Sequence, residues 1–258
     1  MVTVEKRKRD NNSLDFIWKE DAIEYERKKL ADSIDSINNQ IDYFFNGQDL
    51  SRYGMKYREG QINMAMDIVE AIRDNQHLII EAGVGIGKTF AYLIPMIYLN
   101  QITKQQMIVA TSTIALQEQL EGDAENLQKI LGTSIEITVA KGQNNYLCKD
   151  KLEGRTANEP YKTIRLEAKQ GRYGIYDRNK FTIKVSDAVW DKIKVQEFNQ
   201  KYCGGKCKHF ARCYYYNQRR MLQESSGIVI CNQDLLTAHF QYGKKIFNGN
   251  IKIIVIDE

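Results

Sequence analysis

The sequence lacks any long apolar segment. No hydrophobic run among its 258 residues approaches the roughly 20 residues that a membrane-spanning helix needs. The first ten residues, MVTVEKRKRD, are charged where a secretory signal peptide would be apolar. We therefore expect a cytoplasmic protein with no membrane partner. Hydrophobic residues still make up 43% of the chain, which is ordinary for a globular protein with a real core.

Cysteine is scarce, and its number is odd. Thiols stay reduced in the cytosol, so five cysteines argue against a disulfide framework. Three of the five nevertheless fall within "KYCGGKCKHFARC", residues 201–213. Clustered thiolates suit a structural zinc ion or an iron–sulfur cluster, and their spacing alone does not choose between the two.

The net charge is only +4, but it is unevenly distributed. Residues 141–226 hold 19 basic and 9 acidic residues, a net of +10, together with 12 of the 26 aromatic residues. Basic residues interleaved with aromatic ones suit single-stranded nucleic acid, which needs phosphate attraction and stacking platforms. A solvated charged face would give the same pattern, so both interpretations stay open here.

Apolar periodicity predicts alternating strands and helices after an N-terminal helix over residues 14–45, which we expect to pack on the main domain. Short, nearly continuous apolar runs favour a parallel sheet covered on both faces. Pro95 predicts a kink or an early end in its helix. The predicted strands are residues 77–81, 107–111, 135–140, 227–232 and 251–257, and the predicted helices are residues 64–72, 88–100 and 113–131.

A glycine-rich loop between a predicted strand and a predicted helix is the strongest local pattern. It reads "EAGVGIGKTF", residues 81–90, and resembles a Walker A loop with Ala82 where the simplest pattern has glycine. Its glycines let the backbone curl so that amide groups point at phosphate oxygens. Lys88 adds a charge near the β and γ phosphates, and Thr89 offers a hydroxyl to Mg²⁺. The residues expected to bind ATP here are Ala82, Gly83, Gly85, Gly87, Lys88 and Thr89.

Two acidic residues end the last predicted strand. A P-loop enzyme needs a carboxylate that helps to hold Mg²⁺ and a group that activates water. In "IIVIDE" we predict that Asp257 binds Mg²⁺ together with Thr89, and that Glu258 polarises the attacking water. The predicted catalytic residues are therefore Lys88, Asp257 and Glu258.

Taken together, these motifs resemble the iron–sulfur superfamily 2 DNA helicases of the XPD/DinG type, over roughly residues 53–258. Four stretches are similar to the Q-motif, motif I, motif Ia and the first half of the DEAH box: "YREGQ" (57–61), "EAGVGIGKT" (81–89), "VATSTIALQEQL" (109–120) and "VIDE" (255–258). Two more resemble the segments that lead into and out of the cluster domain: "KGQNNYLC" (141–148) and "VICNQDLLTAH" (229–239).

The resemblance implies further site residues. Gln61 would read the adenine edge, and motif Ia would contact DNA. The DNA contacts expected in motif Ia are Thr111, Thr113 and Gln117. The implied ligands of a [4Fe–4S] cluster, with zinc as the alternative, are Cys148, Cys203, Cys207 and Cys213. Cys231 lies in an apolar strand and is interpreted as a buried core thiol.

The implied fold is α/β: a RecA-like P-loop motor domain with a parallel sheet, interrupted by a mostly helical, cysteine-bearing iron–sulfur insertion. The expected divisions are an N-terminal helical extension (1–50), the first part of the motor domain (51–140), the insertion (141–226) and the continued motor domain (227–258).

The implied function is that of an ATP-dependent DNA helicase. It would use ATP and Mg²⁺ to move 5′ to 3′ on single-stranded or forked DNA in repair or replication. The sequence ends within the DEAH box, so we expect a second motor domain in the full-length chain and no appreciable activity from these residues alone. The alternatives are a nucleotide- and nucleic-acid-binding module that does not unwind, and a P-loop ATPase with a zinc-bound nucleic-acid module.

Overall fold

The computed structural model describes residues 32–47, 50–169, 176–196, 198, 200–243 and 245–257. It separates into two compact units, residues 1–102 and 103–258. The boundary falls inside the segment 51–140 that we expected to form one continuous part of the motor domain. In its described parts the first unit holds the phosphate loop, and the second holds the sheet and the cysteine-bearing insertion.

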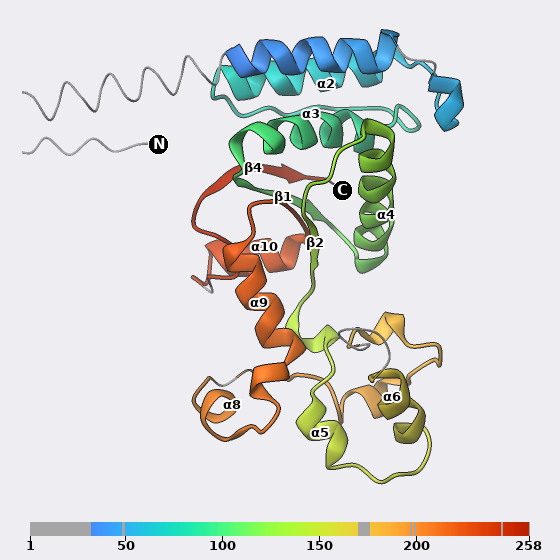
Figure 1. Ribbon diagram of the computed structural model, residues 1–258, viewed down its shortest axis with the longest axis vertical. Coiled ribbons are helices and arrows are strands. Elements are labelled where there is room, and N and C mark those ends of the chain that lie inside the picture. The colour runs from blue at the N-terminus through green and yellow to red at the C-terminus, as the bar shows by residue number, and fades with distance from the viewer. Residues whose placement is uncertain are drawn as a thin grey trace, which may run out of the picture. The chain divides into compact units, whose positions relative to one another are not determined.

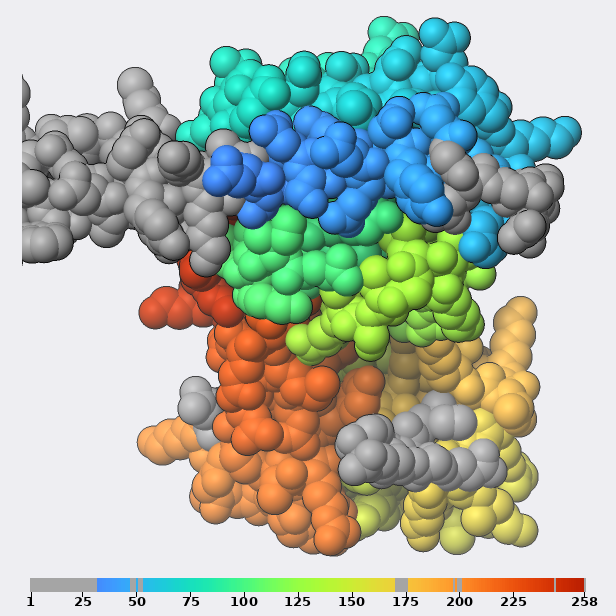
Figure 2. All heavy atoms as spheres, turned by 45° about the horizontal axis from the view of Figure 1, so that its top comes forward, coloured from blue at the N-terminus to red at the C-terminus, as the bar shows by residue number. Residues whose placement is uncertain are grey.

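In the part of the first unit that the structure describes, the regular elements are helices. Residues 32–42 form a helix that continues into η1 (Tyr43–Gly47), and η2 (Leu50–Tyr53) leads to α2 (Glu59–Arg73). In Figure 2 the blue residues of the first helix lie between the cyan residues of α2 and the green residues of α3 (Lys88–Thr103). Its apolar side is buried, as expected of a helix that packs: Ile34, Ile37, Ile41, Phe44 and Phe45. The rest of the predicted N-terminal helix, residues 14–31, lies outside the described residues.

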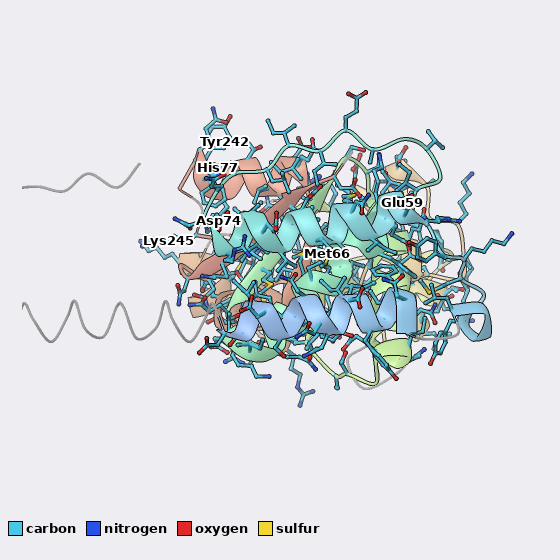
Figure 3. All side chains as sticks on the ribbon, turned by 90° about the horizontal axis from the view of Figure 1, so that it is seen from above. Glu59, Met66, Asp74, His77, Tyr242 and Lys245 are labelled. Carbon is cyan, nitrogen blue, oxygen red and sulfur yellow. The ribbon has the colours of Figure 1, made fainter. Side chains whose placement is uncertain are left out.

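Helix α2 is amphipathic, and its buried residues recur at helical spacing: Gln61, Ile62, Ala65 and Val69. Figure 3 follows this helix from Glu59 past Met66 to its end at Asp74. Helix α3 is apolar around most of its circumference and buries Pro95 in its interior. It continues to Thr103, so the predicted early end is wrong. Packing of this apolar helix outweighs the hydrogen bond that proline removes.

The predicted strand at residues 77–81 is wrong. These residues have no regular secondary structure, and no described strand pairs with them. Ile79 is 98% exposed and Leu78 43% exposed. An apolar, β-branched run predicts a strand, but a strand forms only where a neighbour takes up its amide and carbonyl groups.

The second unit is built on a four-stranded parallel sheet with the order β2-β3-β1-β4. Val109 of β1 lies opposite Ile230 of β3 on one side and Val255 of β4 on the other. The remaining four predicted strands and the parallel arrangement are confirmed within a few residues. The strands are β1 (Gln106–Thr111), β2 (Ile137–Ala140), β3 (Ile228–Asn232) and β4 (Ile251–Ile256).

The crossover helices cover the two faces of this sheet. Helix α4 (Ile114–Leu131) links β1 to β2, and α10 (Gln233–Phe240) links β3 to β4 in the opposite direction across the sheet. Right-handed crossovers that run in opposite directions place their helices on opposite faces, as Figure 1 shows. One face packs Leu235 and Leu236 of α10 against strand residues that include Ile108 and Cys231.

The insertion between β2 and β3 is mostly helical, as predicted, and has a core of its own around Ile164, Trp190 and Ile193. Its elements are η3 (Gln143–Asn145), α5 (Lys149–Glu153), α6 (Tyr161–Glu167), η4 (Arg178–Lys180), α7 (Asp187–Trp190), α8 (Gln200–Lys206), η5 (Phe210–Arg212) and α9 (Tyr214–Glu224). Helix α9 leads back to β3 and packs against β2 (Figure 1). Across the described parts of the chain, no helix combines the length and apolarity needed to cross a membrane.

Candidate nucleotide and nucleic-acid sites

The phosphate loop turns directly into helix α3. Gly85 and Gly87 have φ angles of 84° and 89°, a region that a side chain at Cβ disfavours. The amides of Phe90 and Ala91 each donate to the Gly87 carbonyl at 3.2 Å, so the helix begins at once. Lys88 and Thr89 therefore stand in the first turn of α3, at the positive end of a 16-residue helix. This is the local geometry that an anion-binding loop requires.

Gln61 of α2 is tied to the same loop. Its side chain is 3% exposed, and its Nε2 donates a hydrogen bond of 2.8 Å to the Gly87 carbonyl. A Cβ atom on Gly87 would lie 2.3 Å from that nitrogen. The predicted Q-motif residue thus contacts the phosphate loop itself, and its role at adenine stays a prediction.

Two further contacts secure the loop to the start of α2. The Ile86 side chain lies within 3.7 Å of the positions that Cβ atoms on Gly60 and Gly83 would occupy. The guanidinium of Arg58 lies 3.2 Å from the Cβ position of Gly87, so it brings a positive charge to the loop. We did not predict Arg58, although it stands three residues before Gln61 in "YREGQ". Ala82, where the loop begins, is partly buried.

Asp257 lies at the carboxyl edge of the sheet in the second unit. Its amide donates to the Ala110 carbonyl at 2.8 Å, and Gln233 Nε2 donates to its carbonyl at 3.0 Å. Because the strands are parallel, Thr111 and Asn232 end at the same edge. This is the edge where open α/β sheets bind ligands. Glu258, the predicted water-activating residue, lies outside the described residues.

Of the three predicted DNA contacts in motif Ia, one is exposed. Thr113 caps α4, accepting a hydrogen bond of 3.2 Å from the Leu116 amide through its hydroxyl oxygen. Thr111 is 2% exposed, and Gln117 is fully buried with its Nε2 donating to the Ala140 carbonyl at 3.1 Å. Neither side chain reaches the surface in this structure, and the DNA contacts of Thr111 and Gln117 stay predictions. Ser112 is exposed beside Thr113, and we did not predict it.

The four predicted cluster cysteines are partly buried. Cys148 directly precedes α5, Cys203 lies in the middle of α8, Cys207 follows α8, and Cys213 lies between η5 and α9. Burial raises the pKa of Cys213, and the neighbouring sulfur groups of the other three raise this pKa further. Burial also raises the pKa of Cys148. By contrast, Cys231 is a buried core thiol on β3, as predicted, and burial raises its pKa to about 12.

The two candidate groups require different spacings of the four thiolates. No three histidine, cysteine, aspartate or glutamate side chains among the described residues are grouped to hold one ion. Zinc–sulfur bonds of about 2.3 Å would bring tetrahedral thiolates to roughly 3.8 Å from one another. In a cubane each thiolate binds a different iron, so the same four residue types can lie farther apart.

Most aromatic side chains of the insertion pack locally. Phe210 and Tyr216 have ring centroids 4.2 Å apart, and Tyr176 and Tyr214 stack at 4.8 Å. Tyr202, in contrast, is 52% exposed next to Lys201. Among the described aromatic side chains of the insertion, Tyr202 is the one that is exposed to solvent.

A buried ion cluster joins the sheet to the insertion, and we did not predict it. The Lys141 side chain is 4% exposed, and its Nζ binds Glu118 at 2.8 Å and also the carboxylate of Asp177. Lys141 opens the motif "KGQNNYLC", but a lone lysine among polar residues gives no indication of burial. The two carboxylates lie 23 and 36 residues away in the chain.

Comparison with known proteins gives a consistent result. Residues 63–164 match the DEAD/DEAH box helicase family. The chain is 41% identical over 211 residues to the ATP-dependent DNA helicase YoaA of Escherichia coli K12, covering 78% of this chain and 32% of that protein. It is 25% identical over 225 residues to the ATP-dependent DNA helicase DinG of the same strain, and the match covers 78% of this chain and 31% of that protein. DinG of Photobacterium profundum matches at 26% over 252 residues, covering 90% and 35%. The chain thus spans about a third of the length of these relatives.

Proposed function

Because this chain carries part of a DEAD/DEAH box helicase domain of the DinG and YoaA type, as its motifs predicted, we propose that it is the nucleotide-binding and insertion-bearing part of an ATP-dependent DNA helicase. The full-length protein would move 5′ to 3′ along single-stranded DNA and open forked duplexes in repair or replication. The direction and the pathway rest on the resemblance alone.

The observation that carries this proposal is the hydrogen bond between Gln61 and Gly87. It joins two stretches that are 26 residues apart in the chain. Both stretches resemble motifs that the helicase family places at the nucleotide. A glycine-rich turn that is unrelated to nucleotide binding would not be expected to pack a buried glutamine against its last glycine. The positive φ angles at Gly85 and Gly87, and the start of α3 at Lys88, support the same reading.

In the proposed site, ATP is held by the loop and by the first turn of α3. Lys88 would neutralise charge on the β and γ phosphates, and Thr89 and Asp257 would hold Mg²⁺, which stabilises the charge that develops during phosphoryl transfer. Glu258 would orient the attacking water. A second motor domain in the full-length protein would close over the nucleotide and supply arginines to the γ phosphate.

We propose a [4Fe–4S] cluster as the group held by Cys148, Cys203, Cys207 and Cys213. Four partly buried thiols, three of which raise the pKa of Cys213, fit its donor set, and the resemblance to iron–sulfur helicases favours a cubane over one zinc ion. When bound, the cluster would supply cross-links that fix the otherwise short helices of the insertion. Tyr146, Phe198 and Tyr215 lie in the apolar cluster that also includes Cys148 and Cys213, and this packing limits water at the sulfur atoms.

The proposed DNA partner meets two parts of the second unit. Thr113 and Ser112 present hydroxyl groups and the positive end of α4 to a phosphate backbone. The insertion contributes its excess of basic residues and the exposed ring of Tyr202. Together these features suit a single DNA strand that runs over the motor domain toward the insertion.

The test begins with purification without oxygen and assays of iron, acid-labile sulfide and zinc. We expect about four iron and four sulfide per chain, as a cubane held by four cysteines requires. One zinc without sulfide would contradict the cluster and favour the P-loop ATPase with a zinc module.

The helicase activity is then tested on the full-length protein. We expect single-stranded DNA to stimulate its ATP hydrolysis, and we expect it to unwind forked DNA. Lys88→Ala should abolish both activities while leaving the metal content unchanged, and Lys129→Ala in the last turn of α4 is the matched control. Tight DNA binding without unwinding would instead support the non-unwinding binding module.

A further inference from the structure

The junction between the sheet and the insertion is built around a buried lysine. Lys141 directly follows β2, and its side chain is 4% exposed. Its ammonium group lies 2.8 Å from Glu118 Oε1 on α4, and it also binds the carboxylate of Asp177 in the insertion. One charged group therefore bridges the helix that covers the sheet and the segment that begins η4.

Neighbouring contacts extend this bridge along the same face of α4. Asn179 Nδ2 donates to Glu118 Oε1 at 3.3 Å, and Lys180 Nζ lies 3.8 Å from Glu121 Oε2. Residues 177–180 of the insertion thus meet one turn of α4. The ion pair of Lys180 and Glu121 is more exposed, with side chains 58% and 33% accessible. It therefore stabilises the junction less than the Lys141 bridge does.

The backbone at the junction is held from the other side by α9 and by the insertion. The Lys141 amide donates to the Tyr146 hydroxyl at 3.1 Å, and Arg219 Nη2 donates to the Lys141 carbonyl at 3.5 Å. Gln218 Nε2 donates to the Val139 carbonyl at 2.8 Å. The residues that connect β2 to the insertion are therefore fixed through both main chain and side chain.

Charge balance explains why lysine occupies this place. Burial by itself lowers the pKa of Lys141, but the hydrogen bonds and charges of Asp177 and Glu118 outweigh burial and leave this pKa raised. The same contact with Lys141 lowers the pKa of Glu118. A buried ammonium group is tolerated only when it is paired, and removal of one partner leaves uncompensated charge. The bridge thus strongly favours one relative placement of α4 and the insertion.

We propose that Lys141 is a positioning residue that locks the insertion to helix α4, so that the start of α4 and the cysteine-bearing insertion move as one body. Glu118 lies five residues after Thr113, the exposed cap at which the proposed DNA contact begins. A force on the insertion would therefore reach the start of α4 through little more than one helical turn. This inference goes beyond the proposed function, since it requires neither ATP hydrolysis nor a bound cluster.

Hydrogen exchange on this chain tests the proposal directly. The reporters are the amides of Asn179 and Lys180, which donate to the side chain and to the carbonyl of Asp177. In Lys141→Met, which keeps most of the side-chain volume, we expect these amides to exchange at least about tenfold faster, because local opening becomes easier. Amides of β1 and β3 should keep their protection. Lys180→Met is the matched control, and we expect it to change the same amides less than about twofold.

Three outcomes overturn the proposal: unchanged exchange at the junction in Lys141→Met, an equal increase in Lys180→Met, and a uniform increase over the whole second unit. The last would mean that Lys141 contributes only to general stability. If Lys141→Met fails to fold, Glu118→Gln and Asp177→Asn each remove one charge at constant size. Both should accelerate exchange at residues 176–181 selectively, and a lack of any change in both variants would also reject the lock.

The same variants in the full-length protein separate this inference from the proposed function. If the protein unwinds DNA, Lys141→Met should lower the number of base pairs opened per ATP hydrolysed while leaving DNA-free hydrolysis unchanged. An unchanged ratio would reject the mechanical role. If the protein does not unwind DNA at all, the proposed function fails, and the exchange result still decides whether the lock exists.

Discussion

Gln61 Nε2 lies 2.8 Å from the carbonyl oxygen of Gly87 and donates a hydrogen bond to it. The glutamine is 3% exposed, and the glycine has a φ angle of 89°. The start of α2 and the end of the phosphate loop are therefore one structural unit. A substitution at either residue should therefore change the position of the other. The first prediction follows from this pair.

Gly87→Ala should weaken nucleotide binding. The new Cβ would lie 2.3 Å from Gln61 Nε2, so the glutamine must shift and its hydrogen bond is lost. Alanine at this φ angle also destabilises the loop by about 1 kcal/mol or more. We expect at least a tenfold loss of ATP affinity, about 1.4 kcal/mol, measured by fluorescence titration of the chain.

The control for this prediction is Gly122→Ala. Gly122 lies inside α4, and a Cβ atom there would meet nothing within 4 Å. The same substitution should therefore stabilise the protein by about 0.5 to 1 kcal/mol and leave ATP affinity unchanged. Equal ATP affinity in wild type and Gly87→Ala would show that the Gln61 contact does not shape the nucleotide site.

Cys203→Ser should lose the bound cluster and loosen the insertion while the sheet stays folded. Serine replaces one of four proposed sulfur ligands, and the proposed cluster would cross-link the short helices of the insertion. The measurements are iron and sulfide content and limited proteolysis. Cys231→Ala is the matched control, because Cys231 is a buried core thiol on β3 and its replacement should leave the iron content unchanged. Equal iron in both variants would rule out Cys203 as a ligand.

Gln117→Ala should lower stability without weakening DNA binding. The side chain is fully buried and donates to the Ala140 carbonyl, so its removal leaves that acceptor unpaired at a cost of about 1 to 3 kcal/mol. Urea unfolding measures this loss, and a DNA titration of the folded protein measures affinity.

Thr113→Ala provides the contrast to Gln117→Ala. It removes the exposed cap of α4, so it should cost about 1 kcal/mol and also reduce DNA affinity. If Gln117→Ala weakens DNA binding more than Thr113→Ala does, our account of motif Ia is wrong.

His239 should make the second unit less stable at mildly acidic pH. Its Nδ1 accepts hydrogen bonds from the amides of Ile246 at 2.9 Å and Phe247 at 3.2 Å, and burial lowers its pKa below the usual value. A histidine with a depressed pKa in the folded state stabilises the protein above its unfolded pKa of about 6.5, and this contribution is lost as the pH falls through the folded pKa. Urea unfolding between about pH 7.5 and pH 5.5 should show the decline.

His239→Asn isolates this effect from the other titrating groups. Asparagine offers an acceptor oxygen close to the position of Nδ1 but does not titrate in this range. The pH-dependent loss of stability should therefore be smaller in the variant than in wild type. Identical pH profiles would mean that His239 is not the responsible group.

Much of the candidate nucleotide site could be predicted from the sequence because it depends on local geometry. Gly85 and Gly87 adopt the positive φ angles that their residue type allows, and Lys88 begins a helix as the pattern indicates. The strands at Gln106–Thr111 and Ile251–Ile256 were also predictable, because continuous apolar runs favour burial on both faces of a parallel sheet.

Tertiary structure alone decided the features that depend on distant partners. Residues 77–81 have the composition of a strand, yet no described neighbour pairs with them and Ile79 stays exposed. Gln117 is a polar residue of a type usually found at the surface, but its side chain is buried and donates a hydrogen bond to the Ala140 carbonyl. Lys141 reads as a solvated lysine, but Glu118 and Asp177 converge on it from 23 and 36 residues away. Residue type determines local backbone and apolarity, whereas burial and pairing depend on which remote groups the fold brings together.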